Sequence, residues 1–277
     1  MLNAFSVDVE DWYQVSDFED AVAFESWDQH ESRVVQNTER VLALCAQHGV
    51  RGTFFILTWN AERHPALVRR IADAGHEIAS HGYRHRLIYE QSPAEFRDDI
   101  MRSKKILEDI TGQPVWGYRA PSFSLTAASI WALDVLLECG MRYDSSIFPV
   151  SDRLYGIPNA ARFPFVIRTD GDRRLVEFPM STARAAGRNW PLGGGAYLRV
   201  FPYAYMRWGI HRVNREGQPA LVYMHPWEID PGQPRIKARG KRGMSTHYVN
   251  LARTEGKLVR LLQDFSFAPV RDVLGLN

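Results

Sequence analysis

Residues 52–85 have the sequence GTFFILTWNAERHPALVRRIADAGHEIASHGYRH, which predicts a strand–helix–strand unit. The apolar run Gly52–Leu57 is typical of a buried strand, and apolar residues recur at helical spacing over Trp59–Ala74. A second short strand is expected at Glu77–Ser80. Because a helix commonly connects two parallel buried strands, this unit favours an α/β fold built on a largely parallel sheet.

The same alternation extends along most of the chain. Further strands are expected at Ala4–Val9, Val115–Arg119, Tyr143–Ile147, Leu175–Phe178 and Ala220–His225. Further helices are expected at Asn37–His48, Pro93–Ile110, Ala127–Glu138 and Thr254–Asp264. Pro, Gly and aromatic residues crowd 149–203, so this segment is expected to form long loops with short strands. Since the last strand continues the earlier series, residues 1–277 are predicted to form a single domain with an elaborated C-terminal third.

The composition is that of an ordinary globular protein with a deep core: 277 residues, 45% hydrophobic and 24% charged. The 34 basic and 32 acidic residues give a formal net charge of +2, which is too balanced for a nucleic-acid-binding protein. Only residues 235–242 are locally basic, and we expect a solvated loop there rather than a polyanion site.

The cysteines and the N-terminus bear on the cellular compartment. Cys45 and Cys139 each lie in an apolar stretch with helical periodicity, so buried thiols are expected rather than a disulfide. Residues 1–10 run directly into a strand pattern without the features of a signal peptide, and no window has about 18 uninterrupted apolar residues. We therefore expect a cytoplasmic protein, with peripheral attachment to the inner membrane as an alternative.

Polar side chains gather at the carboxyl ends of five predicted strands, where parallel α/β folds form their ligand sites. They are Asp8, Glu10, Asp11, His81, His85, Arg119, Asp144 and His225. One such coincidence would be easy to dismiss. Five together predict a functional site at this edge of the sheet.

The spacing of His81 and His85 allows both imidazoles to bind one divalent metal ion. Nine histidines in the chain make the spacing weak by itself, so the interpretation depends on the neighbouring carboxylates. Asp8 and Glu10 share one face of an extended strand, so one can bind the metal while the other accepts a proton from a metal-activated water. Asp11 is the alternative ligand if the backbone turns at the end of the strand.

Two other features have a structural and a functional interpretation. Arg119 could form a buried ion pair with Asp144 or could hold the carboxylate of Asp8. Most of the eight tryptophans must belong to the core. Yet Trp12-Tyr13, Trp190, Tyr197 and Trp227 lie near polar clusters or Gly/Pro loops, where their rings could stack on sugar faces.

Taken in order, these motifs resemble those of the polysaccharide deacetylase family (carbohydrate esterase 4, NodB-homology domain). The matching segments are Asp8–Asp11, His81–His85, Arg119–Pro121, Asp144 and the run that ends at His225. Four segments are similar to the deacetylases found with exosortase/PEP-CTERM exopolysaccharide loci: Asp8–Gln14, Tyr118–Ser122, Met224–Glu228 and His247–Asn250. The chain departs from the usual family pattern at Val9, where an aspartate is common, and at Ser122, where an aromatic residue is common.

The resemblance implies a distorted (β/α) barrel of about seven strands, with residues 190–277 as a family-specific extension that completes the barrel. It implies that Asp8 is the general base, that His225 is the general acid and that Arg119 orients Asp8. Asp144 would support the polar network around the base and the acid.

The same resemblance makes His81 and His85 metal ligands, with Glu10 preferred over Asp11 because some relatives have a D-x-D motif. The backbone N–H of Ser122 would stabilise the oxyanion. The remaining candidates for substrate contact are Trp227, Tyr197 and His247. Zn²⁺ is the preferred metal, with Co²⁺, Mn²⁺ or Ni²⁺ as alternatives.

The implied reaction removes N-acetyl groups from amino sugars of a polysaccharide or its lipid-linked precursor and releases acetate. One alternative is hydrolysis of a small cyclic amide or a formamide, as in allantoinase-like or deformylase-like relatives. Another is a non-catalytic carbohydrate-binding protein. The presence of both Asp8 and His225 favours an enzyme, because binding alone needs neither proton-transfer group.

Overall fold

The computed structural model describes residues 1–152, 155–236 and 246–276, and its main feature is a nine-stranded sheet. Hydrogen-bonded neighbours follow the order β10-β1-β2-β3-β4-β5-β7-β6, and β11 also pairs with β1. All these pairs are parallel except β6–β7. The strands are β1 (Leu2–Val9), β2 (Thr53–Ile56), β3 (Glu77–Ser80), β4 (Gly117–Tyr118), β5 (Tyr143–Asp144), β6 (Phe165–Asp170), β7 (Arg173–Glu177), β10 (Leu221–Met224) and β11 (Ser266–Ala268).

The predicted α/β class with a largely parallel sheet is confirmed. The seven expected strands are present as β1, β2, β3, β4, β5, β7 and β10. The short strands expected without bounds within 149–203 include β6 as well as β8 (Thr182–Ala185) and β9 (Arg188–Pro191), which form a small antiparallel sheet, whereas β11 was not expected. Three of these strands lie within the Gly- and Pro-rich region, where turn residues obscure the strand pattern.

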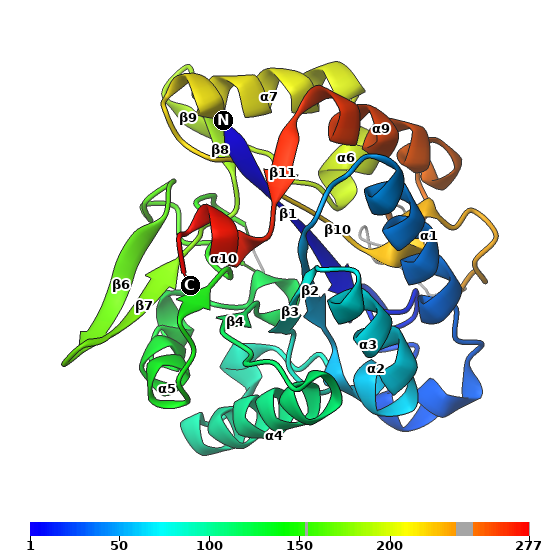
Figure 1. Ribbon diagram of the computed structural model, residues 1–277, viewed down its shortest axis with the longest axis vertical. Helices are drawn as coiled ribbons and strands as arrows, with labels where there is room; N and C mark the ends of the chain where they lie inside the picture. Colours follow the sequence, from blue (N-terminus) through cyan, green and yellow to red (C-terminus); the bar gives the residue numbers. More distant parts are fainter. Residues whose placement is uncertain (153–154, 237–245, 277) are drawn as a thin grey trace.

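Helices surround the central strands, as Figure 1 shows for α1, α3, α4, α5, α7 and α9. Their bounds are α1 (Val34–Gln47), α2 (Thr58–Arg63), α3 (Pro65–Asp73), α4 (Pro93–Thr111), α5 (Ala132–Glu138), α6 (Ala196–Val200), α7 (Tyr203–Arg215), α9 (Leu251–Asp264) and α10 (Val270–Val273). The single helix predicted over Trp59–Ala74 is wrong, because it is divided into α2 and α3 at Pro65. Proline lacks an N–H and disfavours helical geometry in the preceding residue, and His64 has φ −129° and ψ 54°.

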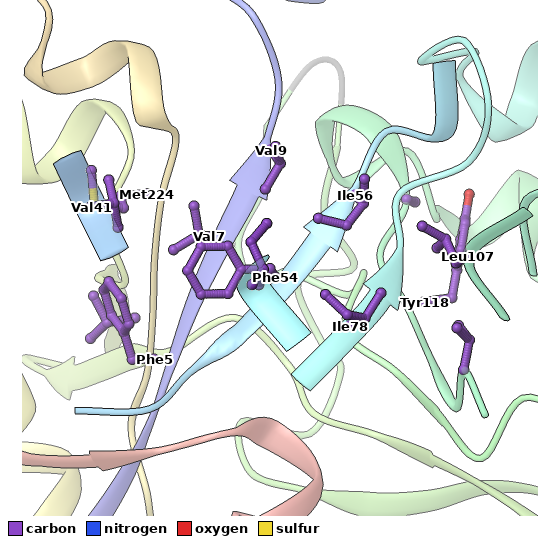
Figure 2. Packing of buried hydrophobic residues seen from close by; sticks show 14 of the residues in the cluster. Phe5, Val7, Val9, Val41, Phe54, Ile56, Ile78, Leu107, Tyr118 and Met224 are labelled. Carbon is purple, nitrogen blue, oxygen red and sulfur yellow. The ribbon is translucent and has the colours of Figure 1, made fainter. Parts of the chain in front are cut away.

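Alternation along β1 separates the two faces of the sheet. Phe5, Val7 and Val9 belong to the large core between the sheet and the helices, which Figure 2 shows with Phe54 of β2 and Val41 of α1. A second, inner cluster includes residues from several strands: Ala4, Phe55, Ala79, Tyr143 and Tyr223. Because successive side chains of a strand point to opposite faces, Asp8 lies on the same face as Ala4, toward the inner cluster.

The carboxyl ends of the central strands lie level with one another. Val7 pairs with Met224 of β10, and Val9 pairs with Ile56, which in turn pairs with Ser80 of β3. The residues that immediately follow β1, β3, β4 and β10 are therefore brought to one edge: Glu10, His81, Arg119 and His225.

Three consecutive glycines bring the chain against β10 beside this edge. Gly194 forms a parallel bridge with Tyr223, and a Cβ on Gly194 would lie 1.6 Å from the Tyr223 carbonyl oxygen. Its φ of +129° is also one that residues with a side chain rarely adopt. Only glycine allows this approach, which places the start of α6 next to the end of β10.

Both cysteines are buried and free, as expected. In the described part of the chain, no helix is long and apolar enough to span a membrane. Of the basic stretch 235–242, residues 237–242 lie outside the described residues.

Candidate active site

A pocket of about 400 Å³ opens at the carboxyl ends of the strands. It is lined by most of the residues predicted to form the site: Asp8, Glu10, His81, His85, Ser122, Tyr197, His225, Trp227 and His247. These residues come from positions 8–247 of the chain, so the sheet brings together side chains that are remote in sequence. Three predicted residues do not line the pocket: Asp11, Arg119 and Asp144.

Glu10, His81 and His85 form a compact group of potential metal ligands. The Nε2 atoms of His81 and His85 lie 2.8 Å and 3.1 Å from Oε1 of Glu10, and one ligand atom from each residue falls within 4.8 Å of the others. All three side chains are buried. Burial raises the pKa of Glu10, but the imidazoles of His85, His225 and His81 outweigh it and hold that pKa well below its usual value.

The other ring nitrogens of the two histidines are engaged by oxygen atoms. Nδ1 of His81 lies 2.8 Å from the carbonyl oxygen of Arg119, and Nδ1 of His85 lies 3.4 Å from Oγ of Ser16. Because a carbonyl oxygen only accepts, Nδ1 of His81 donates to Arg119, and Nε2 is the ring nitrogen that faces Glu10 and would ligate a metal. Two neutral imidazole nitrogens and one carboxylate oxygen suit Zn²⁺ and related divalent ions. The residues present therefore fit a catalytic metal.

Asp11, the alternative ligand, has a different position. Its Oδ2 accepts hydrogen bonds from the Ser32 hydroxyl (2.7 Å), the Arg33 N–H (2.9 Å) and the Val34 N–H (3.2 Å). These donors lie at the first turn of α1. Asp11 therefore accepts hydrogen bonds from N–H groups that have no partner within the helix. The proposal of Asp11 as a metal ligand is corrected on this ground, because both of its oxygens face donors of the fold and neither belongs to the ligand group.

Asp8 is held by Arg119 beneath the pocket. The Nη1 atom of Arg119 lies 2.6 Å from Oδ1 of Asp8 and 2.9 Å from Oγ of Ser6. The guanidinium also donates to the Ser145 carbonyl (3.1 Å), and it is fully buried. Arg119 therefore fixes the orientation of Asp8 rather than pairing with Asp144, and the second carboxylate oxygen is left toward the pocket.

His225 faces both carboxylates from the end of β10. Its Nε2 lies 4.0 Å from Oδ2 of Asp8 and 3.9 Å from Oε1 of Glu10, while its Nδ1 lies 3.4 Å from Oε1 of Glu228. Burial lowers the pKa of His225, but the charges of Glu10, Glu228 and Asp8 exceed this effect and raise the pKa to about 9. The imidazole is therefore charged at neutral pH and carries a proton that it can donate.

Glu228 is a functional candidate that the sequence interpretation missed. It is fully buried, forms an ion pair with Arg199 of α6 and accepts a hydrogen bond from the His225 N–H (3.3 Å). Its position three residues after His225 was an available signal, because i,i+3 residues lie close together in a helical turn. Arg199 had no such signal, since it is distant in sequence and reaches the site only through α6.

Asp144 does not line the pocket, and its support of the polar network around the base and the acid stays a prediction. The carboxylate is fully buried and accepts a 2.5 Å hydrogen bond from Ser146, whose oxygen accepts the Ala120 N–H at 2.8 Å. Burial raises the pKa of Asp144 to about 6 and that of Glu177 well above its usual value. A proton on Glu177 allows these two carboxyl groups to hydrogen-bond. The pair lies beside the Arg119–Pro121 segment because β5, which ends at Asp144, pairs with β4, which ends at Tyr118.

Aromatic rings form two walls of the pocket. On one side, Trp227 is stacked between His225 (5.1 Å between ring centroids) and His247 (4.0 Å). Burial lowers the pKa of His247 to about 2, so this ring is neutral and its Nε2–H donates to Gln233 Oε1 at 2.8 Å. The other wall consists of Phe123, Tyr155, Tyr197, Phe201 and Tyr223.

Ser122 lies at the turn between these walls. Its φ of 50° and ψ of 27° are left-handed, which is uncommon for a residue with a side chain. Oγ of Ser122 lies 2.8 Å from Oγ of Ser16, which also reaches His85. Local backbone strain of this kind often occurs at functional sites, where the surrounding structure fixes it.

Comparisons with known proteins identify two successive segments of the chain. Residues 17–143 match the family model of polysaccharide deacetylases, and residues 145–275 match a model described as a domain of unknown function, DUF3473. The chain therefore contains a polysaccharide deacetylase domain. DUF3473 is a C-terminal domain known in exosortase-associated proteins, so the second segment resembles that group.

Similar curated proteins include a peptidoglycan-N-acetylglucosamine deacetylase of Bacillus cereus, 39% identical over 75 residues that make up 27% of each chain. A chitooligosaccharide deacetylase of Bradyrhizobium is 30% identical over 99 residues, which cover 36% of this chain and 43% of that protein. The matched stretches thus span less than half of these relatives.

Solved structures share the fold over nearly the whole chain. A Mycobacterium smegmatis protein assigned to the polysaccharide deacetylases has a TM-score of 0.63 at 22% identity, covering 99% of this chain and 88% of that one. Puue allantoinase has a TM-score of 0.64 at 15% identity, covering 98% and 88%. The fold is that of the NodB-type deacetylases, and at these identities the likeness concerns the fold alone.

Proposed function

We propose that this protein is a metal-dependent hydrolase that removes N-acetyl groups from amino sugars of a polysaccharide. The observation that carries the proposal is the Glu10, His81 and His85 group in one pocket with Asp8 and His225. A carboxylate beside a protonated imidazole provides the proton acceptor and the proton donor that amide hydrolysis requires.

In the proposed reaction, water attacks the acetamide carbonyl carbon and gives its proton to Asp8. His225 then donates its Nε2 proton to the amine nitrogen as the C–N bond breaks, which yields acetate and a free amino sugar. Arg119 keeps Asp8 in position, and Glu228 keeps the His225 ring oriented with Nε2 toward the substrate. The N–H of Ser122 is the candidate donor to the developing oxyanion.

Glu10, His81 and His85 would hold the metal, with Zn²⁺ as the preferred ion. When bound, such an ion polarises the carbonyl group and makes the attacking water more acidic. The side chains are arranged for this role because each histidine presents Nε2 to Glu10 while its Nδ1 faces an oxygen atom.

The shape of the pocket and the relatives support an amino-sugar polymer as substrate. The named relatives act on peptidoglycan or chitooligosaccharide. Flat aromatic rings on two walls suit the apolar faces of sugar rings, whereas a small cyclic amide would fill little of a 400 Å³ pocket. The association of DUF3473 with exosortases favours an exopolysaccharide or its lipid-linked precursor.

Residues 1–277 are proposed to act as one catalytic domain. Asp8, Glu10 and the two metal-ligand histidines precede residue 143, but His225, Glu228 and Arg199 lie in the DUF3473 segment. Strands β10 and β11 from that segment both pair with β1. Asp8 lies before both matched segments and His225 lies in the second, so the proposed pair of proton-transfer groups requires more of the chain than either segment.

The function is tested by acetate release from N-acetylglucosamine oligomers, with allantoin as the competing substrate, after loading with Zn²⁺, Co²⁺, Mn²⁺ or Ni²⁺. The proposal expects acetate from the oligomers and no turnover of allantoin. Turnover of allantoin alone would establish the small-amide alternative. Oligomer binding without hydrolysis under every metal would establish a carbohydrate-binding protein without catalysis.

A further inference from the structure

Four aromatic residues form a row that leads out of the pocket along α6 and α7. We call Tyr197, Phe201, Tyr205 and Trp208 the aromatic row. Neighbouring ring centroids are 6.2, 4.7 and 5.8 Å apart, and their planes differ by 10°, 30° and 36°. Tyr197 lies in α6, and Tyr205 and Trp208 lie three residues apart in α7, on one side of that helix. Phe201 lies between the two helices in an extended conformation, and its ring contacts both Tyr197 and Tyr205.

The row begins inside the pocket and ends at the surface. Tyr197 and Phe201 line the pocket, whereas Tyr205 and Trp208 lie beyond it. Phe201 is 39% exposed and Trp208 is 42% exposed. Exposed apolar surface of this kind is unfavourable unless it has a partner. A molecule held in the pocket can therefore continue onto these rings without crossing polar surface between them.

The backbone under the row is firmly fixed. Nζ of Lys257 donates to the carbonyl oxygens of Leu198, Arg199 and Phe201, each at 2.8 Å. The Tyr205 hydroxyl donates to the Pro191 carbonyl at 2.7 Å. These bonds hold the end of α6 and the start of α7, so the rings are ordered before any ligand arrives.

We propose that the aromatic row is an extended binding track for the sugar chain whose reactive residue occupies the pocket. The track would stack on sugar rings several units away from the cleaved acetamide, and it rests on the proposed function for the identity of that chain. It makes the enzyme select polymers over short oligosaccharides.

The position of the row favours a sugar chain over a lipid surface. Two of its four rings line the pocket that would hold the acetamide, so a polymer held there lies against the row. Binding to an anionic membrane would instead require a cluster of cations beside the apolar residues. Beside Trp208 on α7, Arg207 is paired with Asp264 (3.3 Å) while Arg212 is exposed, so vesicle binding is measured as the test of the lipid alternative.

The test compares Trp208→Ala, Trp208→Phe and a control, Met101→Ala, which removes a similarly exposed apolar side chain from α4 (50% exposed). Hydrolysis of the disaccharide and of a soluble polymer of N-acetylglucosamine is measured for each. We expect Trp208→Ala to raise KM for the polymer by about three- to tenfold and to leave disaccharide hydrolysis unchanged. Trp208→Phe should retain part of the polymer preference, and Met101→Ala should match the wild type.

Polymer affinity is also measured directly, by affinity electrophoresis of the non-hydrolysing Asp8→Asn protein with and without Trp208→Ala. This measurement separates the track from the reaction: weaker binding in the double variant supports the track even if no acetate is released. Equal polymer affinity overturns it. An equal loss of activity on the disaccharide and on the polymer also overturns the track. Binding to phosphatidylglycerol vesicles is measured as well, and a Trp208→Ala protein that loses only this binding overturns the track too.

Discussion

Oδ2 of Asp8 and Nε2 of His225 lie 4.0 Å apart at the ends of two neighbouring parallel strands, β1 and β10. The first residue comes from the start of the chain and the second from its last quarter. Their strands are in register, with Val7 opposite Met224, so each side chain emerges at the same height. In the proposed reaction, this proximity brings the proton acceptor and the proton donor to the same substrate group.

Asp8→Asn should retain the bound metal and lose turnover by at least about a hundredfold, because the amide cannot accept the proton from water. Metal content by mass spectrometry and acetate release are measured on the same preparation. His225→Asn should show the same pattern from the donor side. Full activity of Asp8→Asn would falsify the proposed mechanism.

The second prediction concerns the three candidate metal ligands. Glu10→Gln, His81→Ala and His85→Ala should each lose metal, since each removes one atom of the ligand group. Chelation should lower the melting temperature of the wild type but leave that of the two histidine variants unchanged.

Asp11→Asn is the matched control for Glu10→Gln. It should retain metal and lose about 1–2 kcal/mol of unfolding free energy, because Asp11 accepts N–H groups at the start of α1. Metal loss in Asp11→Asn together with metal retention in Glu10→Gln would reverse the assignment.

Glu228→Gln tests the residue that orients His225. We expect kcat to fall about ten- to a hundredfold while KM and metal content stay close to wild type, because the carboxylate opposite Nδ1 is lost. The change also leaves Arg199 buried without its ion-pair partner, which lowers stability.

The double variant Glu228→Gln with Arg199→Gln separates these two effects. It removes both charges, so stability should return while kcat remains low. Wild-type kcat in the double variant would show that Glu228 serves only to neutralise Arg199.

His76 gives a prediction of stability against pH. The ring is buried, its Nδ1 accepts the Gly52 N–H at 3.1 Å, and burial lowers its pKa from 6.5 to about 4. Below pH 6.5 the unfolded chain binds a proton that the folded chain excludes. Stability is therefore lost as pH falls from about 6.5 to about 4 and is fully present above that window.

Comparison with His76→Asn isolates this effect, because asparagine can accept the same N–H but does not titrate. Between pH 7.5 and 4.5 the wild type should lose about 2 kcal/mol more unfolding free energy than the variant. Urea denaturation at both pH values provides the measurement. Parallel losses in the two proteins would exclude a neutral buried His76.

Local sequence was sufficient for much of the sheet and for the metal-ligand pair. Strand β2 is a largely apolar buried run, β3 is short and wholly buried, and the polar residues that follow such strands lie at the strand ends. Motif order added Asp8, Arg119 and His225. Sequence could not separate Glu10 from Asp11, because both carboxylates follow the same strand and their orientation depends on where the backbone turns.

What the sequence by itself determined was the α/β class, the edge that carries the site and the types of residue available there, because these depend on periodicity and on the order of short motifs. The tertiary structure alone decided which carboxylate meets each partner. Asp11 faces α1, Asp144 faces Glu177, and Glu228 meets Arg199 across two segments. These pairings, like the course of the aromatic row along α6 and α7, are set by long-range packing and helix placement, which no local pattern encodes.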